Sequence, residues 1–106
     1  MASKHDAARG FDTVKKRLLS ALIDGNYQHE ARDRIDIKND LLMARVTPMQ
    51  LISIIKRSRA HEHFASAHHA DKSITVHMLK TSGWYIKFYF LDPSTVFISV
   101  HLEGQS

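Results

Sequence analysis

The stretch Gly83-Trp84-Tyr85-Ile86-Lys87-Phe88-Tyr89-Phe90 decides the fold, because its side chains alternate with a period of two. Every second residue from Trp84 onward is apolar, whereas Tyr85, Lys87 and Tyr89 between them carry polar groups. Such alternation is typical of a β-strand with one face against a core and the other toward solvent. The strand therefore predicts a sheet whose second face carries two phenols and an ammonium group.

Two further segments, residues 73–79 (SITVHML) and 95–102 (TVFISVHL), repeat this alternation. The short connections 80–83 and 92–94 predict two hairpins and hence an antiparallel meander. The apolar face predicted for the two strands comprises Ile74, Val76, Met78, Val96, Ile98, Val100 and Leu102. The opposite face comprises Ser73, Thr75, His77, Leu79, Thr95, Phe97, Ser99 and His101. Together the three strands predict one polar surface that holds Thr75, His77, Tyr85, Lys87, Tyr89, Ser99 and His101.

Helical spacing replaces alternation toward the N-terminus. Residues 1–10 are small and polar and predict a flexible tail. A helix is expected over residues 12–24, with Asp12 as its N-cap and Gly25 just past its end. The apolar positions of this helix are Phe11, Val14, Leu18, Leu19, Leu22 and Ile23.

Three further segments complete the first half of the chain. Residues 29–44 predict a helix among many charges, which residues 36–38 can interrupt. Thr47-Pro48 indicates the start of a buried helix, since threonine caps well and proline suits the first helical position. Residues 60–70 (AHEHFASAHHA) predict a short helix or a single helical turn.

Helices followed by strands predict an α+β fold, with N-terminal helices packed on one face of a C-terminal antiparallel sheet. The length of 106 residues suits one domain, expected over residues 11–106 after the tail. No linker or internal repeat interrupts this unit.

Composition narrows the function classes. The chain has no cysteine, which excludes disulfides, thiolate catalysis and cysteine-ligated zinc. Residues 1–10 lack an apolar run, so we expect no signal peptide or membrane helix, no membrane partner and a cytoplasmic location. Fifteen Lys and Arg against 11 Asp and Glu give a net charge of +4, which favours an anionic partner such as nucleic acid.

The predicted polar surface contains the groups that ribonucleotide cleavage needs without a metal. A base takes the 2′-hydroxyl proton, a cation stabilises the phosphorane, and an acid protonates the leaving 5′-oxygen. His77 and His101 are the candidate acid and base in either order, with Tyr85 assisting proton transfer. Lys87 and Tyr89 are candidate RNA-binding residues, because tyrosine rings stack on unpaired bases. The plain alternative is a solvated sheet face, on which tyrosine is common and lysine serves solubility.

Charged and imidazole side chains outside the three strands offer three weaker signals. Arg59 and His63 are candidate phosphate contacts at an RNA site. The group His61, Glu62, His63, His68 and His69 also suggests a metal site, but no HExxH motif or carboxylate-rich triad completes it. We therefore expect no metal and no cofactor. Arg32-Asp33-Arg34 is read as a surface charge cluster, with phosphate binding as the alternative.

The chain resembles the MqsR family of bacterial toxins, within the RelE-like group of messenger-RNA endoribonucleases, over about residues 11–103. Gly83-Trp84-Tyr85-Ile86-Lys87 is similar to that family's Gly-x-Val-Tyr-Leu-Lys strand. The other matching features are the Val14-Lys15-Lys16 helix with its turn at Gly25, the Leu51–Ile55 helix followed by Phe64 and Ser66, and the closing strand Phe97-Ile98-Ser99-Val100-His101.

The resemblance implies site residues and a role. It carries a tyrosine onto Tyr85 and a basic residue onto His101, while the family's lysine falls on Ala65 and its glutamine near Val76 or His77. It implies a toxin that cleaves single-stranded messenger RNA and is held inactive by a cognate antitoxin protein. The antitoxin can also bind operator DNA, so the toxin can join a repressor complex.

A second hypothesis uses the same fold without catalysis. In it the chain is a protein- or nucleic-acid-binding module, for example a phage or plasmid inhibitor protein. The alanine at position 65 supports this alternative.

Overall fold

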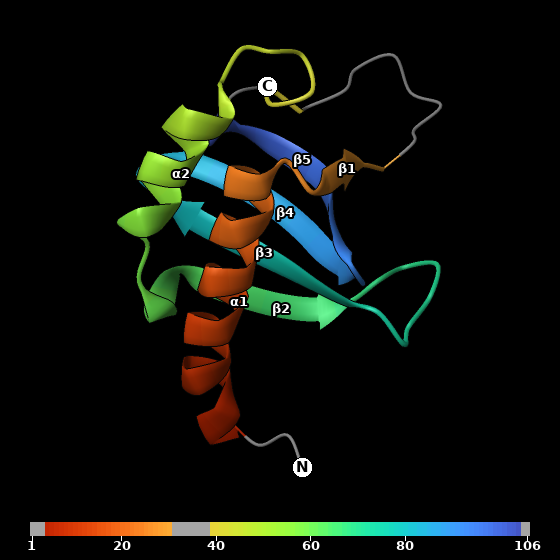
Figure 1. Cartoon of the computed structure of the whole chain (residues 1–106). Coiled ribbons are helices and arrows are strands. Elements are labelled where there is room, and N and C mark those ends of the chain that lie inside the picture. The colour runs from red at the N-terminus through yellow and green to blue at the C-terminus, as the bar shows by residue number, and fades with distance from the viewer. Residues whose placement is uncertain (1–3, 31–38, 105–106) are drawn as a thin grey trace.

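A computed structural model describes residues 4–30 and 39–104, in which two α-helices cover one face of a five-stranded sheet (Figure 1). The elements are α1 (Lys4–Asp24), β1 (Tyr27–His29), α2 (Pro48–Lys56), the 3-10 helix η1 (Ala60–Glu62), β2 (His63–Ala67), β3 (Thr75–Thr81), β4 (Trp84–Leu91) and β5 (Ser94–Leu102). The strand order is β1-β5-β4-β3-β2. The predicted α+β class is confirmed, but the sheet is mixed, because β1 runs parallel to β5.

Strands β3, β4 and β5 form the predicted antiparallel meander. The turn between β3 and β4 uses Ser82 and Gly83, whose φ angles of 53° and 80° are both positive. Positive φ at both central residues is the geometry of a type I′ turn, whose twist matches that of a hairpin. The three strand segments expected from period-two alternation thus occur within two residues of the predicted bounds.

The face predicted for β3 is wrong. Leu79 is fully buried in the core beneath the helices and pairs with Ile86, and His77 pairs with Phe88 on that same side. Val76 instead pairs with Tyr89 on the face turned away from the helices. The reason is a second, smaller apolar cluster on that far face, formed by Val76, Tyr89, Val96 and Ile98 with Ile74 packed against it.

A β-bulge explains the second departure from the predicted faces. The register of β4 and β5 shifts between Lys87 and Phe88: Lys87 pairs with Ser99, whereas Phe88 pairs with Phe97. Strand β5 therefore has one extra residue, Ile98, at this point. Such an insertion exchanges the two faces to which odd- and even-numbered side chains of the strand point. Phe97 and Val100 both enter the core beneath the helices, although strict alternation placed them on opposite faces.

Helix α1 begins at Lys4, so residues 4–10, expected as a tail, are helical and Asp12 lies inside the helix rather than at its cap. Its end at Asp24 is confirmed. Gly25 has φ 71°, and the Asn26 N–H donates to the Ala21 carbonyl at 2.9 Å. This 6→1 bond with a left-handed glycine is the Schellman ending of a helix.

The helix expected over residues 29–44 is wrong wherever the structure describes that segment. Tyr27–His29 is strand, and Asn39 bridges to Val100 of β5. The Asn39 side-chain amide donates to His29 Nδ1 at 3.0 Å, which ties the two pieces together. Backbone pairing with β5 therefore outweighs the helical pattern. Residues 31–38, which include Arg32-Asp33-Arg34, lie outside the described residues.

The segment 60–70 is likewise corrected. Its first three residues form η1, but His63–Ala67 is a strand paired antiparallel with β3. Small residues that suit a helix by propensity are held extended here by the ladder with β3, since tertiary pairing overrides propensity.

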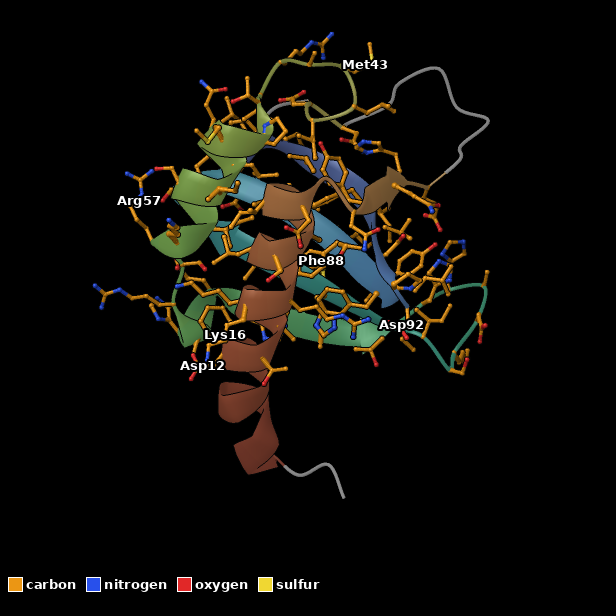
Figure 2. The ribbon with its side chains drawn as sticks, viewed as in Figure 1. Asp12, Lys16, Met43, Arg57, Phe88 and Asp92 are labelled. Atoms are coloured by element: carbon orange, nitrogen blue, oxygen red, sulfur yellow. The ribbon has the colours of Figure 1, made fainter. Side chains whose placement is uncertain are left out.

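The core lies between the helices and the sheet. Phe88, fully buried, points from β4 toward α1 (Figure 2). The other buried side chains of this core are Phe11, Leu18, Leu22, Leu41, Val46, Leu51, Ile54, Ile55, Leu79, Ile86, Phe97 and Val100. Within the described ranges, neither helix is long and apolar enough to span a bilayer.

The start of α2 gives the first test. The Thr47 hydroxyl accepts from the Gln50 N–H at 3.1 Å, and the Gln50 side chain accepts from the Thr47 N–H at 2.9 Å, a complete capping box. We expect Thr47→Ala to lower the free energy of unfolding by about 1 kcal/mol and the melting temperature by roughly 4–8 °C. Thermal unfolding measures this shift.

The matched control is Ser53→Ala on the exposed side of α2. It should leave stability unchanged or raise it slightly, because alanine has the higher helix propensity. Equal losses in both variants would contradict the capping role of Thr47.

Candidate functional site

Tyr85 and His101 lie side by side on the sheet face turned away from the helices. They are direct partners in the β4–β5 ladder, and their ring centroids are 5.1 Å apart with planes tilted by 36°. Directly opposed residues of an antiparallel pair hold their side chains close on one face. The structure therefore brings together two of the residues that the sequence analysis placed on one sheet surface.

A shallow hollow of about 260 Å³ surrounds this pair and adds two side chains that the sequence analysis did not select. Lys80, the β3 partner of Tyr85, and Glu103, just past β5, line it together with Gly104. Residues 80–83 were expected to be a hairpin connection. The available signal was the alternation itself, because continuing it from Val76 and Met78 puts Lys80 on the same face.

The Tyr85 hydroxyl is a proton donor in this environment. It donates to Met78 Sδ at 3.3 Å, and burial raises the pKa of the phenol above its ordinary value. A phenol with a raised pKa keeps its proton at neutral pH. Tyr85 is therefore suited to donate a proton or a hydrogen bond rather than to act as a base.

His101 has one ring nitrogen engaged. Its Nδ1 lies 2.9 Å from the Leu102 carbonyl oxygen, and a carbonyl can only accept. This assigns the proton of the neutral ring to Nδ1 and leaves the lone pair on Nε2. A half-buried imidazole with a free Nε2 is a candidate general base.

Lys87 and Tyr89 lie on the same face but not in this hollow. Lys87 lines a second hollow with Glu30, Ser66, Ala67, His68, His69, Val76 and Ile98. The Tyr89 hydroxyl donates to Glu30 Oε1 at 3.4 Å, and the Tyr89 side chain belongs to the smaller apolar cluster. Burial, followed by the Glu30 carboxylate, raises its pKa. With its ring packed, Tyr89 cannot serve as the open stacking surface that the sequence suggested.

His68 has both ring nitrogens occupied. Its Nδ1 accepts from the Ala70 and Asp71 N–H groups at 3.0 and 3.3 Å, so Nε2 carries the proton and donates to Glu30 Oε1 at 3.0 Å. The ring therefore joins the turn after β2 to the residue that follows β1, which is a structural role.

His77 and His63 form a separate pair on the helix side of the sheet. His63 Nε2 and His77 Nδ1 are 3.0 Å apart, and their rings stack at 5.2 Å. His77 packs against Phe88 and Phe90, and His63 packs against Phe11. The predicted grouping of His77 with Tyr85 and His101 is therefore wrong, because the sheet separates them.

The environment of this pair disfavours the imidazolium form. Burial, then the charges of His63 and Arg17, lowers the pKa of His77 to about 4, and burial also lowers the pKa of His63. Both rings are neutral at pH 7, with one donating to the other.

The remaining predicted contacts are dispersed. Arg59 is exposed ahead of η1, where its N–H donates to the Glu62 carboxylate at 2.8 Å, and it lines neither hollow. His61 is exposed, while His63 and His68 are engaged on different sides of the sheet. Over residues 4–30 and 39–104, no three His, Asp or Glu side chains come together as a metal site.

Comparison of the chain with protein-family models, with curated proteins and with solved structures finds no match. The candidate site therefore rests on its geometry: Lys80, Tyr85 and His101 from three adjacent strands around one hollow, with Glu103 at its rim.

The buried histidine pair gives a pH-dependent prediction. An unfolded imidazole titrates near 6.5, whereas folded His77 titrates near 4, so the unfolded state binds more protons between these values. The contribution of His77 to the free energy of unfolding is fully present above pH 6.5 and is lost as the pH drops toward 4. After allowance for partial exposure of the ring, we expect the free energy of unfolding to fall by about 1–2 kcal/mol. Chemical denaturation at pH 7.5, 6, 5 and 4.5 measures the loss.

The variant His77→Gln should flatten this profile, because its side chain does not titrate. His61→Gln, at an exposed position, should keep the slope of the parent chain. Parallel profiles for all three proteins would contradict the assignment to His77.

Proposed function

We propose that the chain is a metal-independent endoribonuclease that cleaves single-stranded messenger RNA at the hollow between Lys80, Tyr85 and His101. The observation that carries the proposal is the meeting of a phenol, an imidazole and an ammonium group on one open sheet face. These are the three kinds of group that transesterification at a phosphodiester requires.

Each residue has a role that follows from its surroundings. His101 Nε2 takes the proton of the 2′-hydroxyl, whose oxygen then attacks phosphorus. Lys80 neutralises the charge that builds on the non-bridging phosphoryl oxygens. The bond from phosphorus to the 5′-oxygen breaks, and the Tyr85 hydroxyl, protonated at neutral pH, supplies the proton to that oxygen. The products are a 2′,3′-cyclic phosphate and a 5′-hydroxyl.

Lys80 also bears on the resemblance to the MqsR and RelE-like toxins. The lysine of that pattern falls on Ala65, which pairs with His77 and so faces the helix side, away from Tyr85. A lysine at position 65 would not reach the hollow. Lys80 takes the place of that cation from the neighbouring strand, and the alanine no longer argues against catalysis.

The biological role we propose is that of a toxin in a toxin–antitoxin pair. Its support is the resemblance over residues 11–103 together with the Tyr85–His101 pairing. In this role a cognate antitoxin protein neutralises the chain, and operator DNA is bound through the antitoxin. The net charge of +4 suits an RNA substrate.

Three substitutions test the catalytic roles. His101→Ala should lower kcat about 10²–10⁴-fold, the range for loss of a general base. Lys80→Met should lower it about 10²–10³-fold, by loss of charge stabilisation. Tyr85→Phe should slow cleavage while leaving RNA binding nearly unchanged. Cleavage of a fluorescent single-stranded RNA, with EDTA present throughout, measures all three rates.

The control is Lys16→Met, which removes an exposed lysine from α1 on the other side of the sheet (Figure 2). It should cleave like the parent chain. Induced expression should arrest growth, and His101→Ala should relieve the arrest. A purified chain that leaves single-stranded RNA intact would overturn the proposal.

A non-catalytic binding module is the second candidate, and the edge strand β2 favours it. Strand β2 ends the sheet, and its sequence HFASA has neither an acidic or lysine side chain nor a proline to discourage strand addition. In this case Tyr85→Phe and His101→Ala weaken binding of a partner, and no RNA is ever cleaved.

A further inference from the structure

An exposed aromatic ring lies one strand beyond the candidate site. Phe64 of β2 keeps 47% of its surface exposed, on the same sheet face as Lys80 and Tyr85. Its register partner is Met78, and the Lys80 ammonium lies 5.5 Å from the centroid of its ring. The one other β2 side chain on this face is Ser66, which is small, so the ring is not covered by its own strand.

Four adjacent strands thus contribute to one surface. Lys80, Tyr85 and His101 are directly paired across β3, β4 and β5, and Phe64 of β2, in register with Met78, lies diagonally from Lys80. Neighbouring strands are about 4.8 Å apart, which puts the Phe64 strand about 10 Å from the Tyr85 strand. Lys80 lies on the strand between these two, and its ammonium group is 5.5 Å from the centroid of the Phe64 ring. Aromatic ring, cation and aromatic ring in sequence is the arrangement that holds alternating bases and phosphates of a single strand.

We propose that Phe64 is a stacking subsite for the base of one nucleotide that flanks the scissile phosphate. The inference rests on the proposed endoribonuclease function. It adds a substrate-binding residue that takes no part in the cleavage reaction itself. Lys80 holds the phosphate while its ammonium group stays over the Phe64 ring, so one lysine links the reaction centre to the subsite.

The chemistry of the ring defines what it recognises. Phenylalanine has no hydrogen-bonding group, so it offers a base its flat face and reads no base edge. The subsite should therefore strengthen binding and fix the position of the RNA with little preference among the four bases. It also requires an unstacked base, because the bases of a duplex are covered by their neighbours.

Phe64 is a positioning residue, so its loss should act on KM more than on kcat. The variant Phe64→Leu keeps an apolar side chain of similar bulk but removes the ring. We expect a loss of about ten- to a hundredfold in kcat/KM on a short single-stranded RNA, carried by KM. Phe64→Trp should restore or exceed the activity of the parent chain. Leu91→Ala, at a strand position of similar exposure, is the control and should change nothing.

An abasic scan isolates the stacking contact. A set of RNAs, each with one base removed at a successive position around the cleavage site, is cleaved by the parent chain and by Phe64→Leu. One abasic position should lower kcat/KM for the parent about as much as the substitution does. That same RNA should show no further loss with Phe64→Leu. Equal sensitivity of both proteins at every position would overturn the subsite.

The failure of the subsite is distinguishable from the failure of the proposed function. If no RNA is cleaved, the endoribonuclease proposal fails, and binding of a 2′-O-methyl RNA by fluorescence anisotropy tests the subsite alone. If Phe64→Leu binds this RNA more weakly, and one abasic RNA lowers the affinity of the parent chain by a similar amount, the result supports stacking without catalysis. Unchanged affinity in that variant, or no binding by the parent chain, overturns the subsite.

Discussion

The pairing of β4 with β5, including its bulge, is the constraint on which the site and the core both depend. From Lys87 back to Trp84, the ladder sets Tyr85 against His101. Beyond the bulge it sets Phe88 against Phe97, whose rings lie 6.2 Å apart in the core. Without the extra residue at Ile98, keeping His101 on the open face would force Phe97 onto that face too. One inserted residue thus allows the same strand to bury its phenylalanine and present its histidine.

The sheet also separates two chemically different sets of histidine. On the helix side His63 and His77 share a hydrogen bond among phenylalanine rings, and the low pKa of His77 keeps it neutral near physiological pH. On the open face His101 touches solvent and keeps Nε2 free. All three rings are half-buried, but His63 and His77 are hydrogen-bonded to each other among phenylalanine rings, whereas His101 has Nε2 free to exchange a proton. Alternation suggested a joint role for His77 and His101 because it placed both on the polar face, but β3 turns His77 and Leu79 toward the helices instead.

Much of the fold follows from the sequence, and the failures have physical causes. Alternation locates β3, β4 and β5 because long paired strands must satisfy it over many residues. It cannot choose the face of β3, since Val76 and Leu79 both enter apolar clusters, on opposite sides. It also misses β1 and β2, whose few residues are held by backbone bonds to a neighbour rather than by their own pattern. Tyr85 and His101 were found because their strands were found. Lys80 was missed because the predicted strand ended one residue too early.

Under the endoribonuclease function that we propose, the geometry of the open face favours a single-stranded substrate. Lys80, Tyr85 and His101 are paired directly across β3, β4 and β5, and Phe64 on β2 lies diagonally from Lys80, so in the proposed complex the RNA runs across the strands. Aromatic rings on this face can contact bases only when those bases have left their own stack. A duplex can present its phosphates to Lys80, but its stacked bases offer no free face to Phe64. Its backbone is also too constrained to bring a 2′-oxygen in line with the leaving 5′-oxygen. In the proposed function, the preference for single strands therefore follows from aromatic and cationic side chains one strand apart.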